Sequence, residues 1–139
     1  MISAIDSNVL LDILIPNEAF ADAATASIED AAASGSLVVS GIVYAEICIQ
    51  FATQRECDHF FDSNEIRIEP LNRSAHFLAS RIWREYRAQG GKRDRILPDF
   101  LIGAHAQVQA NRLISRDRGF YGTLFPKLTL IDPVRHSDQ

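Results

Sequence analysis

The sequence predicts an α/β protein, a three-layer α/β/α sandwich with a central five-stranded parallel sheet. Short apolar segments of strand type alternate along the chain with longer segments that have helical periodicity. Such alternation is typical of a parallel sheet that is covered by helices on both faces. The length of 139 residues suits one compact domain with a real core.

Five short apolar runs are predicted to be the strands of this sheet. They cover residues 2–5, 36–40, 65–69, 112–115 and 127–131. The first is sharply bounded, because the apolar run Ile2–Ile5 stops at Asp6. The third contains Ile66–Glu69, in which apolar and charged residues alternate, and this pattern indicates a more exposed strand.

Six segments with helical periodicity separate or flank these strands. They cover residues 9–15, 18–33, 41–53, 55–62, 72–89 and 98–110. Pro16 ends the first segment, and Ser40 is placed to cap the third. Pro98 suits the first turn of the last one.

The segment at residues 72–89 is the best-defined amphipathic helix. Its apolar stripe consists of Ala75, Leu78, Ala79, Ile82 and Tyr86. Arg81, Arg84 and Arg87 lie off this stripe. Phe77 and Trp83 are interpreted as core or interface residues in preference to surfaces on which bases stack.

No linker, repeat or low-complexity tract divides the chain, so we predict one domain over residues 1–135 and a polar tail at 136–139. The hydrophobic fraction of 47% argues against disorder. No apolar run approaches the roughly 18 residues of a membrane span, and no secretory signal is recognisable. Cys48 and Cys57 are interpreted as free thiols in a reducing compartment, so we expect the cytoplasm.

Charge is unevenly distributed along the chain, although the net charge is only −4. Residues 1–65 carry eleven acids and one base, whereas residues 81–118 carry nine bases and four acids. This asymmetry indicates either a polyanionic partner or arginines on solvated helix faces, and the sequence leaves both interpretations open.

Four carboxylates are candidates for a common site, although three of them also have ordinary structural explanations. Asp6 is placed to cap a helix, and Asp99 suits the positive end of a helix dipole. Asp117 lies in a loop close to Gly119, as in an Asx turn. Glu46 is different, because its helical neighbours are apolar: Ile42, Val43, Ile47 and Ile49. A carboxylate in such surroundings requires a metal ion or an arginine from elsewhere.

The four acids can converge at one edge of the predicted sheet, because two of them directly follow strands. Oxygen ligands without His or Cys suit a hard cation, Mg²⁺ or Mn²⁺. Asn8 and Ser115 are candidates for orienting Asp6 and Asp117 from the second shell. Asp12 also lies near in sequence, but a surface position explains it adequately.

These residues resemble the PIN-domain family, in particular small ribonuclease toxins of the VapC type. The matching segments cover nearly the whole chain in order: Ile5–Leu10, Ser40–Ile47, Pro98–Ala104, Ser115–Asp117 and Gly119-Phe120. Some relatives carry a further Asp two residues after the fourth acid, where this chain has Gly119.

The resemblance implies a metal-dependent endoribonuclease in which Asp6, Glu46, Asp99 and Asp117 bind Mg²⁺ or Mn²⁺. It also implies a homodimer and a cognate antitoxin that wraps the early helices and occludes the site. We expect single-stranded or looped RNA as the substrate. Arginines close to the acids in sequence are candidates for holding its phosphates: Arg93, Arg95, Arg116 and Arg118.

Two other functions stay open at this point. A phosphatase or phosphotransferase of another α/β family also uses an Asp after the first strand. The aspartate-nucleophile phosphatases need a second Asp two positions on, where this chain has Asn8. The other alternative is a non-catalytic binding module whose acidic pocket docks an arginine of a partner.

Overall fold

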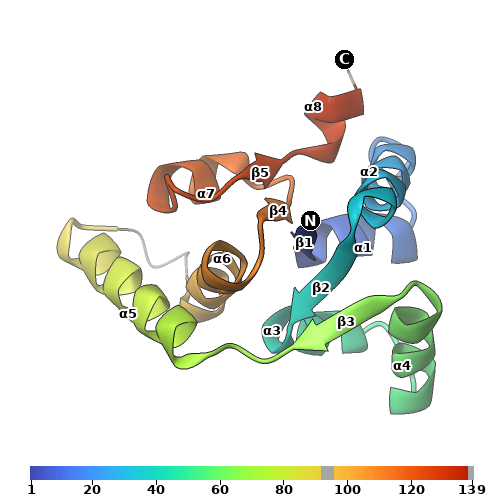
Figure 1. The fold of residues 1–139 in the computed structure, drawn as a ribbon, viewed down its shortest axis with the longest axis horizontal. Coiled ribbons are helices and arrows are strands. Elements are labelled where there is room, and N and C mark those ends of the chain that lie inside the picture. Colours follow the sequence, from blue (N-terminus) through green and yellow to red (C-terminus); the bar gives the residue numbers. More distant parts are fainter. Residues whose placement is uncertain (92–95, 138–139) are drawn as a thin grey trace.

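A five-stranded sheet, parallel throughout, lies at the centre of the protein (Figure 1). The computed structural model describes residues 1–91 and 96–137. The order of the strands is β3-β2-β1-β4-β5. Their bounds are β1 Ile2–Ile5, β2 Ser36–Ser40, β3 Ile66–Glu69, β4 Arg112–Ile114 and β5 Leu130–Ile131. The predicted fold class is confirmed.

Helices cover both faces of the sheet. Their bounds are α1 Ser7–Leu14, α2 Ala21–Ser34, α3 Gly41–Cys48, α4 Gln54–Ser63, α5 Arg73–Ala88, α6 Leu97–Gln109, α7 Arg118–Leu124 and α8 Pro133–Ser137. The chain moves outward from β1 to β3 and then returns to β4, so right-handed crossovers place α5, α6 and α7 opposite α1, α2 and α4. Figure 1 shows the two groups on either side of the sheet.

The core is formed by the three inner strands and the helices packed on them. Val38 and Leu113 are completely buried, as are Phe61 on one side and Phe100 and Phe125 on the other. Strands buried on both faces read as continuous apolar runs, which is why they were recognisable in the sequence. None of the described helices is long and apolar enough to cross a membrane.

Several predicted bounds are wrong. The helix expected over residues 41–53 ends at Cys48, because the Thr53 side chain accepts a hydrogen bond from the Glu56 N–H (3.2 Å) and begins α4. The fifth strand begins at Leu130 and not at residue 127. Helices α7 and α8 were not predicted at all, and α8 continues past Arg135.

The order in which strands are added to the sheet changes direction between β1 and β4, which are adjacent and parallel. Their pairing continues to the strand ends, where the Asp6 N–H donates to the Ile114 carbonyl (3.0 Å). In open α/β sheets the crevice beyond such a switch point is the usual place for a ligand. Asp6 and Ser115 are the first residues beyond these two strands.

Candidate active site

Asp6 lies at the end of β1 and caps α1, so its two carboxylate oxygens have separate roles. Oδ1 accepts a hydrogen bond from the Ser7 N–H (2.8 Å) at the start of the helix. Oδ2 accepts from the Ser115 hydroxyl (2.8 Å) and the Asn8 side-chain amide (3.3 Å). Only 6% of Asp6 is exposed, and it is therefore a buried carboxylate in a fixed orientation.

Burial raises the pKa of Asp6 to about 6 from its usual value near 4. Hydrogen bonds from Ser115, from the Ser7 backbone and from Tyr121 oppose this rise, whereas the charge of Glu46 adds to it. An ionised Asp6 is thus held by neutral donors in a region of other negative charges. A nearby cation would stabilise it.

Asn8 and Ser115 tie the loop after β4 to Asp6. Asn8 Oδ1 accepts from the Arg116 N–H (3.2 Å), and Ser115 Oγ accepts from the Asp117 N–H (3.0 Å). The two side chains also meet each other at 3.3 Å. The structure therefore places both predicted orienting residues in direct contact with Asp6, and their role around a metal stays a prediction.

Tyr121 brings three of the four acids into one region. This buried residue of α7 shares a hydrogen bond with Asp6, and the charges of Asp6, Asp99 and Asp117 all act on its hydroxyl. Burial, together with these charges, raises the pKa of Tyr121 far above its usual value, so the hydroxyl stays protonated. Sequence reasoning missed Tyr121, because α7 was not recognised as a helix.

Asp99 sits in the first turn of α6, as predicted. Its Oδ2 accepts from the Ile96 N–H (3.3 Å), so part of the carboxylate caps its own helix. Asp117 begins α7 and lies directly after the Ser115 that contacts Asp6. Both acids are partly exposed and accessible to a ligand.

Glu46 is exposed, which corrects the prediction that its surroundings are apolar. Helix α3 ends at Cys48, and Ile49, one of the neighbouring apolar residues, is itself 78% exposed. Its carboxylate accepts a hydrogen bond from the Ser7 hydroxyl (2.7 Å), a contact between residues 39 positions apart that no local pattern predicts. Glu46 therefore needs no buried counter-ion, yet it still lies close enough to act on the charge of Asp6.

The predicted phosphate-binding arginines are placed very differently. Arg116 forms a bidentate ion pair with Asp12 (2.6 and 3.1 Å) and lies 4.1 Å above the Phe20 ring. Asp12 is buried, so its interpretation as a surface residue was wrong. Arg118 pairs with Asp132 (3.3 Å) and is partly exposed. The two other arginines, at positions 93 and 95, lie outside the described residues.

The acids suit a hard cation in their chemistry, although they do not form a closed cage. Within residues 1–91 and 96–137, no three His, Cys, Asp or Glu side chains are arranged as a ready metal site. Asp6, Asp99 and Glu46 all accept hydrogen bonds from the protein, so each of these carboxylates already has a partner. Mg²⁺ commonly binds through one or two carboxylates and keeps its waters, so this arrangement fits such an ion.

A family model described as PIN domain matches residues 4–124. The chain belongs to the PIN domain family. A search of curated proteins found no match. The matched range covers most of the chain and contains Asp6, Glu46, Asp99 and Asp117.

Solved structures with this PIN fold include chains from three bacterial complexes. VapBC2 from Rickettsia felis, bound to a DNA fragment from its promoter, matches with a TM-score of 0.73 at 19% identity, over 94% of this chain and 98% of that chain. VapBC-1 from nontypeable Haemophilus influenzae matches with a TM-score of 0.71 at 18% identity, over 96% of this chain and 98% of that chain. FitAcB from Neisseria gonorrhoeae matches with a TM-score of 0.63 at 19% identity, over 96% of this chain and 98% of that chain.

Proposed function

We propose that this PIN domain is a Mg²⁺- or Mn²⁺-dependent endoribonuclease and the toxin of a type II toxin–antitoxin pair. The observation that carries the proposal is Asp6, a buried carboxylate with three further acids nearby at a topological switch point. A buried anion in negative surroundings is stabilised by a divalent cation, and a cation held there can neutralise charge on a phosphate and activate a water molecule.

Asp6, Asp99 and Asp117 would hold the ion, with Glu46 at the exposed side. When bound, Mg²⁺ or Mn²⁺ would neutralise charge on the scissile phosphate and make a water molecule more acidic. Ser115 and Asn8 keep Asp6 Oδ2 in one direction, and Ser7 does the same for Glu46. Tyr121, a buried residue of α7, donates a hydrogen bond to Asp6.

The proposal includes a protein partner. The similar structures are VapBC and FitAB complexes, and this likeness of fold supports an antitoxin that binds the present chain. A homodimer and a cytoplasmic location belong to the same proposal and follow the resemblance of the sequence to VapC-type toxins.

The proposal is tested by RNA cleavage with purified protein in the presence of Mn²⁺ or Mg²⁺. We expect Asp6→Asn and Asp99→Asn each to lower the cleavage rate by about 100-fold or more, because a ligand matters at least as much as its outer-shell partners. Asp22→Asn is the matched control, since Asp22 is an exposed acid on α2. Removal of the metal with EDTA should abolish cleavage.

Equal cleavage by the wild type and both site variants would identify a contaminating nuclease and refute the proposal. A wild type that cuts no RNA but binds a partner through Asp6 would instead support the non-catalytic binding module.

A further inference from the structure

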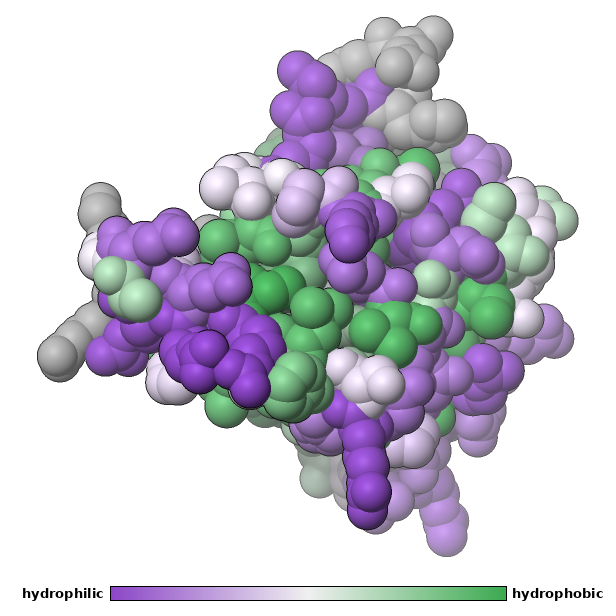
Figure 2. All heavy atoms as spheres, turned by 60° about the vertical axis from the view of Figure 1, so that its left-hand side comes forward, coloured by the Kyte–Doolittle hydropathy of each residue, from purple (hydrophilic) through white to green (hydrophobic). Residues whose placement is uncertain are grey.

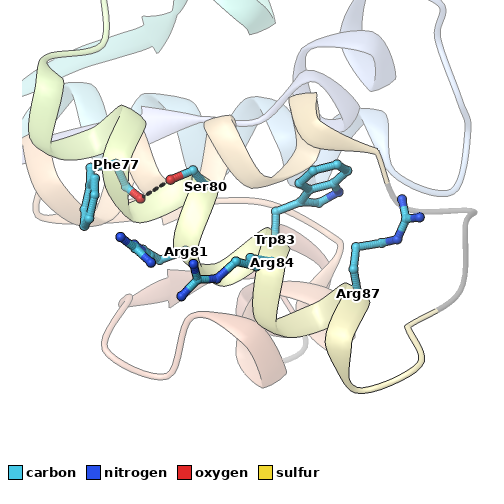
Figure 3. A pocket seen from close by; sticks show the side chains of 6 residues that line it. All are labelled: Phe77, Ser80, Arg81, Trp83, Arg84 and Arg87. Carbon is cyan, nitrogen blue, oxygen red and sulfur yellow. Dashed lines mark hydrogen bonds between the residues drawn. The ribbon is translucent and has the colours of Figure 1, made fainter.

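The outer face of α5 carries arginines and aromatic rings side by side. The inner face of this helix is packed against α6, and Ala75 and Ala79 are completely buried. The outer face forms an open hollow of about 580 Å³. We name it the α5 arginine face, and it is lined by Phe77, Ser80, Arg81, Trp83, Arg84 and Arg87 (Figure 3).

Phe77 is 59% exposed, so of the two interpretations, core or interface, the core one is wrong for this residue, whereas Trp83 is half-buried. The Arg81 guanidinium lies 4.6 Å from the centre of the Phe77 ring, and the Arg87 guanidinium lies 5.4 Å from the Trp83 ring. These cation–π contacts hold planar groups at the surface, where a further flat group can stack. The Trp83 indole N–H is buried without a hydrogen-bond acceptor in the part of the chain that the structure describes.

The α5 arginine face is positively charged in a protein that is negative overall. Among the described residues, neither Arg81, Arg84 nor Arg87 forms an ion pair with a carboxylate. Figure 2, in which this side of the molecule comes forward, shows hydrophilic residues gathered beside apolar ones. Three unpaired cations next to an exposed ring are complementary to a polyanion that also has flat apolar groups.

The inner side of α5 packs against α6, the helix whose first turn carries Asp99. The Tyr86 ring lies 5.4 Å from the ring of Phe100, the residue after Asp99. From Phe77 to Arg87 the helix extends about 15 Å at 1.5 Å per residue. The α5 arginine face is thus on the outer side of the helix that packs against the helix of Asp99.

We propose that the α5 arginine face binds single-stranded RNA, with Arg81, Arg84 and Arg87 on its phosphates and Phe77 against a base. The inference rests on the proposed function, because it assigns a surface to the flanking part of the same RNA. Acidic residues at the site repel a polyanion, and separate cations must compensate for that repulsion. The exposed Phe77 ring beside the arginines favours unpaired bases over a duplex or an acidic peptide.

Binding is measured by fluorescence anisotropy with a labelled 20-nucleotide single-stranded RNA in EDTA, so that no cleavage occurs. We expect Arg81→Gln with Arg84→Gln to weaken binding by about tenfold and to reduce the salt slope by about 1.4, or 0.7 for each phosphate contact. Phe77→Ala should weaken binding by about fivefold or more through lost stacking. Arg55→Gln on α4 is the matched control for one lost charge, and it should bind as the wild type does.

A 20-base-pair RNA duplex separates stacking from charge, because its bases are not available to Phe77. The duplex should lose affinity with the arginine variants and keep it with Phe77→Ala. Unchanged binding of single-stranded RNA by the arginine variants would overturn the proposal. If those variants instead lost self-association while binding RNA normally, the face would be a protein interface, and the proposal would be overturned as well. An equal loss with Arg55→Gln would overturn it as well. If the wild type cuts no RNA, the proposed function fails, and the EDTA assay still decides the α5 arginine face.

Discussion

Two charged regions of the molecule differ in how their charges are held. One is the acidic edge of the sheet, by which we mean Asp6, Glu46, Asp99 and Asp117, and the other is the α5 arginine face. Asp6 is buried, and four donors from three elements fix its carboxylate. Arg81 and Arg84 are exposed on one helix, and the Arg81 guanidinium lies over the exposed Phe77 ring. Chemistry on a phosphate requires charges at fixed positions, whereas binding of a flexible strand tolerates mobile ones.

This difference predicts unequal losses of stability when an arginine is replaced in the two regions. Arg116 pairs with the buried Asp12 beside the acidic edge, so Arg116→Met leaves a buried carboxylate without its partner. We expect a loss of about 3 kcal/mol in the free energy of unfolding. Arg84→Met on the exposed face should cost at most about 0.5 kcal/mol. Urea denaturation of the two variants makes the comparison, and equal losses would contradict it.

The second prediction concerns the pH dependence of stability in EDTA. The pKa of Asp6 is about 6 in the folded protein and 3.8 in the unfolded chain. Its contribution is therefore fully present below pH 3.8 and is lost as the pH rises through 6. Asp6→Asn should gain roughly 2–3 kcal/mol over the wild type at pH 8 and lose that advantage near pH 4.

The measurement is the melting temperature of both proteins between pH 4 and pH 8. Glu46 and Tyr121 act on Asp6, Asp99 and Asp117 act on Tyr121, and all four are present in both proteins, so the difference between the two curves reports mainly the ionisation of Asp6. Parallel curves would show that Asp6 ionises as a solvent-exposed acid does. No variant on the α5 arginine face should change this pH dependence.

The sequence predicted the parts of the molecule that depend on local pattern. Buried strands are continuous apolar runs, and Asp6 directly follows the first of them, so both were recognisable. The environment of Glu46 was not recognisable in the sequence, because the exposure of this side chain depends on where α3 ends and on what it packs against. The ion pair of Arg116 with Asp12 joins residues 104 positions apart, so no local pattern in the sequence predicts it.

Tyr121 shows the same limit at the acidic edge. Helix α7 spans seven residues, and two of them are glycines, so its periodicity is too weak to recognise. Tyr121→Phe removes a hydrogen bond to Asp6 that holds the pKa of that carboxyl down. We expect the pKa of Asp6, measured by carboxyl-carbon NMR, to rise further, with a loss of about 1 kcal/mol in stability. Tyr44→Phe on α3 is the control and should leave the Asp6 titration unchanged.

The smallest predicted effect tests whether the acidic edge can accept one more carboxylate. Gly119 occupies the position at which some relatives carry Asp, and a Cβ there would meet nothing within 4 Å. Gly119→Asp adds a charge in the first turn of α7, close to Asp117, and should strengthen Mn²⁺ binding by about threefold. Gly122→Asp is equally unhindered but lies later in the helix, so it controls for the added charge. Isothermal titration with Mn²⁺ compares the two, and a gain at both positions would mean that metal binding follows net charge and not the geometry of the acidic edge.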